Sequence, residues 1–411
     1  MNRVELKAII DEQLANLEIV DVHTHLFPAD FDGLLLWGID EILTYHYLIA
    51  EFFRYSSLDY REFFRLPKAR QAELVWQTLF LDRSPVSEAQ RGVLTILNRL
   101  GLDVKSRSLE AYREYYRGLT LQGQIDQVFK LAGVKEIVMT NDPFDPQERA
   151  VWKRGTAGDP RFKSSLRIDP LMMNFPAAAE VLQGEGYNVT GDFGGNSAAE
   201  VRRFLTDWVE KIDALYMAAS LPPTFTVDDN SLRSRVLKEC ILPVCREQGI
   251  PFAMMIGVKK LVNPGLELAG DSVGKAEIGV VEQLCSEYPE NKFLVTMLSR
   301  ENQHELAITA RKYRNLLVFG CWWFLNNPSL VEEITALRVE TLGLSFIPQH
   351  SDARVLEHLI YKWDHSREII GRVLLEKYAD LGATGWQVSA AEIERDLKQL
   401  FQGNFRAFVG R

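Results

Sequence analysis

Short apolar runs rich in β-branched residues alternate along the chain with longer segments of helical periodicity. This alternation is typical of βα units and predicts a parallel sheet with helices on its faces. The predicted strands are 19–22, 136–140, 164–168, 216–220, 251–256, 292–297, 316–321 and 344–348. Eight strands of this kind are what a closed (β/α)8, TIM-like barrel requires, so we expect an α/β barrel.

The helical segments divide into three groups by their position relative to the predicted strands. About 115 residues separate the first two strands, far more than one crossover helix needs. We expect a helical insertion at 30–132 that caps the barrel mouth, with further helices closing the chain after the last strand. Nothing resembling a repeat or a low-complexity linker interrupts 1–411, which favours a single domain. The predicted helices are 40–54 and 87–99 in the insertion, 198–214, 231–248, 275–288, 303–313 and 329–342 between strands, and 351–377 and 390–408 at the end.

Composition and charge narrow the function classes. The chain has 411 residues, of which 46% are hydrophobic and 25% charged, and this is the composition of an ordinary globular protein. Its formal charge of −9 argues against a nucleic-acid partner. No apolar run approaches the roughly 20 residues of a membrane helix, so no membrane partner is expected.

Two features favour a cytoplasmic location. The first residues carry dispersed acids and lack the apolar run of a signal peptide. The four cysteines have no metal-type spacing, so we interpret them as buried thiols in a reducing compartment. They are Cys240, Cys245, Cys285 and Cys321.

The strongest chemical signal is Asp21-Val22-His23-Thr24-His25, where the first predicted strand ends. Residues two apart on a strand point to one face, so both imidazoles should project together from the carboxyl end of the barrel. Neutral imidazole is a common zinc ligand, and such a pair needs further ligands from elsewhere. The alternative is a chance pair of surface histidines.

Asp352 follows the eighth predicted strand, which neighbours the first strand in a closed barrel. It could therefore complete the His23/His25 site, either as a metal ligand or as the base for a bound water. A metal lowers the pKa of its ligands, so the sequence leaves the choice between ligand and base open. The alternative is a helix N-cap for the segment that follows.

Two arginines are candidates for binding a substrate carboxylate. Arg354 lies two residues beyond Asp352, and its planar guanidinium suits bidentate binding of an acid. Arg167 ends the third predicted strand, where burial of a charge needs a partner. An ordinary surface ion pair and a structural salt bridge are the respective alternatives.

Aromatic residues near the predicted mouth complete the candidate site. His46 and Tyr47 lie in the insertion, where they could face the barrel mouth or simply pack in the core. Trp322 and Trp323 follow the seventh predicted strand, where they could stack on a sugar ring or form a wall of the core.

The ordered set of these motifs resembles a known family. His23-Thr24-His25 with a late Asp352 resembles the metal-dependent amidohydrolase superfamily. More narrowly, His46-Tyr47, Ser351-Asp352-Ala353-Arg354 and Gly320-Cys321-Trp322-Trp323 look like uronate isomerase, also called glucuronate isomerase, in its atypical bacillus-type branch. The resemblance also covers 140–145, 166–170, 252–259 and 298–302.

That resemblance implies reversible aldose–ketose isomerisation of D-glucuronate to D-fructuronate and of D-galacturonate to D-tagaturonate through an enediol. It implies one divalent metal ion, zinc, on His23, His25 and Asp352. Catalytic roles would fall to Asp352, Tyr47 and His46, and His46 would also bind substrate together with the residues Arg167, Arg354, Trp322 and Trp323.

One departure from the hydrolases of the superfamily bears on the reaction. Those enzymes usually carry further histidines after strands five and six, but the corresponding stretches 253–256 and 295–298 contain none. This favours a single metal and an isomerase. The rival hypotheses are a mononuclear hydrolase or decarboxylase of the same superfamily and a non-catalytic sugar-acid binding protein. Association into a homo-oligomer stays open.

Overall fold

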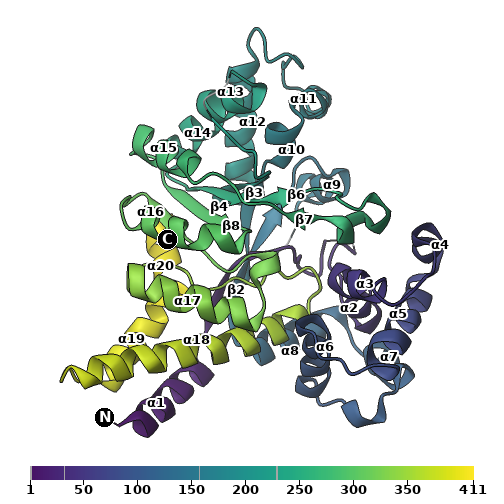
Figure 1. Ribbon diagram of the computed structural model, residues 1–411. Helices are drawn as coiled ribbons and strands as arrows, with labels where there is room; N and C mark the ends of the chain where they lie inside the picture. The colour runs from purple at the N-terminus through teal and green to yellow at the C-terminus, as the bar shows by residue number, and fades with distance from the viewer. Residues whose placement is uncertain (1, 32, 157, 228–229) are drawn as a thin grey trace.

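The structure is a computed structural model that describes residues 2–31, 33–156, 158–227 and 230–411. Its parallel strands form one curved sheet in the order β1-β2-β3-β4-β5-β8-β9, with helices packed around it (Figure 1). β6 (Val258–Lys259) and β7 (Ser272–Val273) form a separate antiparallel pair. The strands of the main sheet are β1 (Ile19–Thr24), β2 (Val134–Asn141), β3 (Phe162–Arg167), β4 (Ala214–Leu221), β5 (Phe252–Ile256), β8 (Phe293–Met297) and β9 (Leu316–Val318).

The eighth predicted strand, 344–348, is reduced to one parallel bridge between Phe319 and Ile347. Its backbone has other partners: the Asn404 side-chain amide donates to the Phe346 carbonyl at 2.7 Å, and Pro348 has no N–H to donate. The prediction of a regular strand here was therefore wrong, although the segment occupies the eighth position of the barrel.

Beyond that segment the chain reaches β1 and closes the ring. The Asp352 N–H donates to the His23 carbonyl at 3.1 Å, and the His25 N–H donates to the Ala353 carbonyl at 2.8 Å. The predicted barrel is confirmed, and its closure lies at the residues that the sequence singles out for metal chemistry.

Helices connect and cover the strands largely as predicted. Every residue of β1, β5 and β8 is buried, as expected for parallel strands covered on both faces. The four cysteines are buried free thiols, as predicted. The connecting helices are α9 (Pro146–Arg154), α10 (Asp169–Met173), α11 (Phe175–Gly184), α12 (Ser197–Ile212), α13 (Leu232–Val236), α14 (Leu242–Glu247), α15 (Gly279–Glu287), α16 (Gln303–Ala310) and α17 (Pro328–Leu342).

A group of helices lies between β1 and β2, where the insertion was predicted, and gathers at one side of the sheet (Figure 1). The predicted helix 40–54 is broken, because Tyr45 has an extended backbone with ψ 141° and a new helix begins at His46. His46 and Tyr47 therefore stand in the first turn of that helix. The group comprises α2 (Ile39–Leu43), α3 (His46–Phe52), α4 (Tyr60–Arg65), α5 (Lys68–Trp76), α6 (Glu88–Arg99), α7 (Leu109–Arg117) and α8 (Leu121–Ala132).

The long C-terminal helix α18 (His358–Ala383) begins later than the predicted 351–377. Asp352 has a left-handed backbone with φ 50°, and Val355 forms a parallel bridge with Leu36, so 351–357 is not helical. Asp352 is thus not an N-cap, and that alternative is wrong. The remaining helices are α1 (Arg3–Asn16), α19 (Ala390–Lys398) and α20 (Asn404–Val409). Among the described residues, we find no helix with the length and apolar character needed to span a bilayer.

Candidate active site

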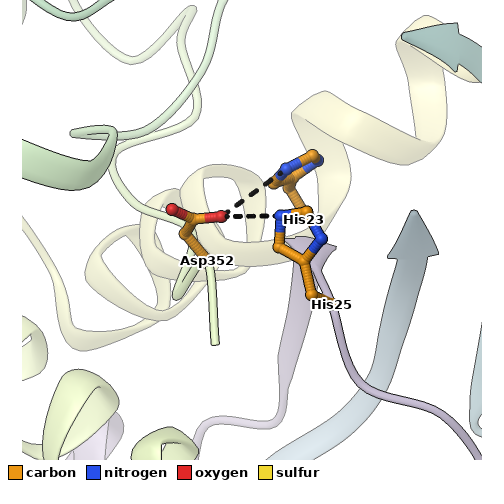
Figure 2. Close-up of side chains that lie close together, drawn as sticks. All are labelled: His23, His25 and Asp352. Atoms are coloured by element: carbon orange, nitrogen blue, oxygen red, sulfur yellow. Dashed lines mark ion pairs between the residues drawn. The ribbon is translucent and has the colours of Figure 1, made fainter. Parts of the chain in front are cut away.

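His23, His25 and Asp352 converge at the carboxyl end of the barrel (Figure 2). Nε2 of His25 lies 3.2 Å from Oδ1 of Asp352, and Nε2 of His23 lies 3.7 Å from the same oxygen. All three residues are largely or fully buried. The structure thus brings together the three residues for which the sequence predicted metal binding.

Local backbone geometry explains this convergence. His23 lies in β1 and His25 directly after it, so their side chains leave the strand on one face. Asp352 is held against the same strand by the hydrogen bond from its N–H to the His23 carbonyl, in a left-handed conformation that aspartate tolerates better than most residues.

A tyrosine sets the tautomer of His23. The Tyr216 hydroxyl donates its single proton to the Val22 carbonyl at 2.7 Å, so its oxygen must accept the hydrogen bond from Nδ1 of His23 at 3.2 Å. Nδ1 of His23 therefore carries the proton, and the lone pair of Nε2 points toward Asp352. This is the second-sphere arrangement that prepares a histidine for binding a metal.

Protonation states in the cluster also suit a metal. Burial lowers the pKa of His23 to about 3 and that of His25 to about 4, so both imidazoles are neutral near pH 7. For Asp352, burial opposes ionisation, but the close contact with Nε2 of His25 and the neighbouring Arg354 charge hold its pKa well below the usual range. Neutral imidazole and ionised carboxylate are the forms that coordinate a cation.

The donor atoms fit a divalent metal ion. Oδ1 of Asp352 is buried and accepts no hydrogen bond that meets normal geometry, while the lone pair of His23 Nε2 faces it. Two acceptors facing each other in a buried site repel unless a cation lies between them. The set of two imidazoles and one carboxylate, with room for further ligands, matches catalytic rather than structural metal sites.

Behind this cluster lies Asp21, which the sequence showed only as part of the motif. Its Oδ1 accepts from the Ser351 N–H at 3.0 Å and its Oδ2 from the Trp363 indole at 2.8 Å. Burial raises the pKa of Asp21 to about 6 against the opposing effect of these hydrogen bonds. Asp21 therefore links β1, α18 and the segment that carries Asp352.

The two predicted arginines differ in their partners. Arg167 donates through Nε to Asp169 at 2.9 Å, so the structural salt bridge considered for it does form. Arg354 is partly exposed and has no hydrogen bond or ion pair with any described residue. Both charges influence the pKa of His25, which places them near the candidate metal ligands. Arg354 is thus the cation available to an added anion.

His46 and Tyr47 stand side by side with their rings 4.6 Å apart. Nε2 of His46 is buried and lacks a hydrogen-bond partner among the described residues, and the Tyr47 hydroxyl is buried beside that of Tyr45. Burial lowers the pKa of His46 and raises that of Tyr47, so both side chains are neutral near pH 7. His46 can accept a proton and Tyr47 can donate one.

The two tryptophans occupy different positions. Trp323 packs edge-on against His46 at 5.7 Å, and its indole N–H is buried without a partner among the described residues. Both tryptophans belong to the cluster of apolar side chains that fills the barrel interior, which agrees with the core-wall alternative, but only Trp323 contacts His46. Trp323 is therefore the better placed of the two for a ligand beside His46.

A cavity of about 310 Å³ lies between the insertion and the barrel. His46, Tyr45, Arg354 and Leu268 are among its lining residues. A larger cavity of about 720 Å³ is mostly apolar and includes Asp169 but none of the candidate metal ligands. The chemistry therefore points to the smaller cavity as the approach to the site.

Two buried residues near the site were not singled out by the sequence. His350 packs against His23 with ring centroids 5.3 Å apart, and neither of its ring nitrogens has a partner among the described residues. Lys362 is buried on α18 beside Tyr47. The available signal was a lysine within the otherwise apolar stretch Leu359-Ile360-Tyr361-Lys362-Trp363.

Comparison with known proteins identifies the family. No protein-family model and no curated protein matches the chain. Among solved structures, a uronate isomerase from Bacillus halodurans C-125 is 53% identical with a TM-score of 0.99, over 100% of this chain and 97% of that one. A uronate isomerase from Thermotoga maritima (17% identity, TM-score 0.77, 98% and 97% covered) and a glucuronate isomerase from Caulobacter crescentus (17%, 0.78, 98% and 94%) share the fold. The barrel, its cluster of two histidines and an aspartate, and the full-length identity together lead to one conclusion: this chain belongs to the uronate isomerase family.

Proposed function

We propose that this protein interconverts hexuronates, D-glucuronate with D-fructuronate and D-galacturonate with D-tagaturonate. The observation that carries the proposal is the 53% identity over the whole chain to a uronate isomerase. The free Arg354 guanidinium beside the His23, His25 and Asp352 cluster supports the proposal. A sugar acid offers its carboxylate to the guanidinium and its hydroxyl oxygens to a metal held by the cluster.

The reaction needs no co-reactant. A proton leaves carbon 2 and another arrives at carbon 1, while the proton of the oxygen on carbon 2 is lost and the oxygen on carbon 1 gains one. The intermediate is an enediol. The site must therefore provide a base, an acid and a group that stabilises charge on adjacent oxygens.

In the proposal, His23, His25 and Asp352 hold one divalent ion, zinc. When bound, such an ion supplies Lewis-acid stabilisation of substrate oxygens. The low pKa of Asp352 favours its role as ligand over a role as base, because a weakly basic carboxylate takes a carbon-bound proton poorly.

Arg354 and Arg167 bind the substrate in this scheme. Arg354 is free to grip the carboxylate through two parallel hydrogen bonds. Arg167 keeps its ion pair with Asp169 and contributes a spare N–H to a hydroxyl. Trp323 presents its unpaired indole N–H on the same side as His46, and Trp322 supports it from the core.

His46 and Tyr47 carry the protons. Neutral His46 has an unengaged Nε2 and accepts the proton from carbon 2, whereas protonated Tyr47 donates to the oxygen on carbon 1. Their adjacency matches the adjacency of the two substrate carbons, which supports a shared role in both half-reactions.

Three further points belong to the proposal. The chain acts as one domain, 1–411, with 30–132 as an insertion over the mouth. The buried free cysteines support a cytoplasmic location. Association of copies remains a prediction.

The test is incubation of the metal-replete protein with D-glucuronate or D-galacturonate in deuterated water, followed by NMR. We expect the matching ketose, with deuterium at carbon 1 or carbon 2. Asp352→Asn should abolish turnover, while Asp11→Asn, at an exposed ion pair with Lys7, should not change it. Absence of ketose from both acids would overturn the proposal, and hydrolysis of a lactone panel would then favour the hydrolase rival.

A further inference from the structure

Lys362 is a buried lysine without a counter-ion in contact. Its residue is 2% exposed, and it has no hydrogen bond or ion pair with any residue that the structure describes. Its Nζ instead lies 5.8 Å from the ring centroid of Tyr47 and 5.8 Å from that of Tyr361. The ammonium therefore lies near two aromatic rings, one of which belongs to the candidate active site.

Such a placement is costly for folding. An ammonium taken out of water without a paired carboxylate loses far more hydration energy than the faces of two rings return. A methionine would fill the same space at no such cost. Burial lowers the pKa of Lys362 to about 8, and the charge of Asp352 is the largest influence that opposes this shift. The side chain thus stays mostly cationic at neutral pH.

The folding cost of burying Lys362 has a functional explanation if negative charge develops next to its ammonium group during the reaction. Tyr47 is the candidate-site residue whose ring Lys362 faces, and its hydroxyl is buried beside that of Tyr45. No described arginine or lysine other than Lys362 has its cation placed over the Tyr47 ring. A phenolate formed at Tyr47 would therefore have two cations near it, since the Arg354 charge also favours ionisation of Tyr47 and Lys362 lies over the ring.

We propose that Lys362 is a positioning residue that stabilises the Tyr47 phenolate during proton transfer. This inference rests on the proposed isomerase function. In the step concerned, the O–H bond of Tyr47 breaks and an O–H bond forms to the substrate oxygen on carbon 1, leaving its electron pair on Tyr47. The proton from the oxygen on carbon 2 later restores the phenol, so charge and atoms balance.

The decisive variant is Lys362→Met, which keeps length and removes charge. With Nζ 5.8 Å from the centroid of the phenolate ring and an intermediate dielectric, removal of the charge should cost roughly 10- to 100-fold in kcat. KM for D-glucuronate should change by less than about 3-fold, because an interaction made only in the transition state affects kcat. The control is Lys292→Met, where a lysine directly before β8, at the amino end of that strand, lies over the Phe408 ring and donates to the Phe408 carbonyl. It should leave kcat unchanged.

A double-mutant cycle with Tyr47→Phe identifies the residue through which Lys362 acts. In the Tyr47→Phe background, Lys362→Met should cause no further loss of residual kcat, because the group that would carry the negative charge is gone. Additive losses would overturn the inference, since Lys362 would then act elsewhere.

Thermal unfolding separates this role from a structural one. Removal of an unpaired buried charge should raise the unfolding temperature of Lys362→Met above that of the wild type while turnover falls. Lower stability with unchanged kcat would overturn the inference and leave the isomerase function intact. A wild type without ketose formation would instead overturn the proposed function itself, and this inference with it.

Discussion

Asp21 accepts a hydrogen bond from the backbone N–H of Ser351 at 3.0 Å, and this bond joins the first barrel strand to the segment that carries Asp352. The other carboxylate oxygen of Asp21 is occupied by the Trp363 indole. Both oxygens of the Asp21 carboxylate accept from N–H groups, and these groups can only donate. The spacing between the two histidines and Asp352 thus depends on the Asp21 carboxylate.

The first prediction replaces that carboxylate with an amide. In Asp21→Asn, the side-chain NH2 group must face either the Ser351 N–H or the Trp363 indole, leaving a buried donor unpaired. We expect a loss of about 1–3 kcal/mol in the free energy of unfolding and about 10- to 100-fold in metal affinity. Competition with a chromogenic chelator measures the affinity. Asp213→Asn, at an exposed carboxylate, should leave it unchanged, and an unaltered affinity in Asp21→Asn would show that Asp21 does not position the ligands.

The second prediction concerns the carboxylate clamp. Arg354→Lys keeps the positive charge but cannot form two parallel hydrogen bonds to a carboxylate, so kcat/KM for D-glucuronate should fall roughly 10- to 100-fold. An aldohexose that lacks the carboxylate should show no such difference between wild type and variant. Steady-state kinetics on both sugars is the measurement. The exposed Arg372→Lys on α18 is the control, and equal losses on both sugars would contradict a carboxylate-specific role.

The third prediction uses the buried carboxyl of Glu357, which joins α18 to the insertion. It accepts hydrogen bonds from the Gln124 side chain at 2.9 Å and from the Gly38 N–H at 3.2 Å. Burial raises the pKa of Glu357 to about 7. Below the pKa that Glu357 has in the unfolded chain, its carboxyl is protonated in both the folded and the unfolded state. As pH rises toward 7, the unfolded chain ionises first, so the folded state loses stability over this window.

That loss amounts to about 3 kcal/mol between roughly pH 4.5 and 7. Glu357→Gln does not titrate, so its urea-unfolding free energy should fall less than that of wild type across this range. The exposed Glu12→Gln should run parallel to wild type. If Glu357→Gln also runs parallel, the carboxyl is not protonated in the folded state and the raised pKa is wrong.

Much of the cluster of His23, His25 and Asp352 could be predicted from the sequence, because its geometry follows from general rules. His23 and His25 share a face since side chains on a strand alternate. Asp352 meets them since the first and last strands of a closed barrel are neighbours. Neither rule needs knowledge of individual side-chain conformations.

Other parts depend on packing that no local pattern records. The break before His46 arises from the extended backbone of Tyr45, although the apolar pattern continues across it. The placement of Lys362 against Tyr47 depends on how α18 meets the insertion, two segments more than 300 residues apart in the chain. The Arg167 ion pair, in contrast, involves Asp169 only two residues away and was within reach of the sequence.

The last prediction concerns the close contact between Gly320 and His350. Gly320 has φ +67°, and a Cβ at this position would lie 2.0 Å from the His350 ring. His350 in turn packs against the metal-ligand candidate His23. Gly320→Ala must therefore bear a backbone cost and also push His350 toward His23.

Gly249 separates these two effects, because it has φ +68° and a Cβ added there would meet nothing within 4 Å. Gly249→Ala should cost about 1–2 kcal/mol of unfolding free energy from the backbone alone. Gly320→Ala should cost about 1–3 kcal/mol more from overpacking. Only Gly320→Ala should also weaken metal binding, since only it displaces a ring that supports His23. Equal losses of unfolding free energy in the two variants would mean that the His350 ring moves aside without cost. An unchanged metal affinity in Gly320→Ala would show that His23 does not depend on His350 for its position.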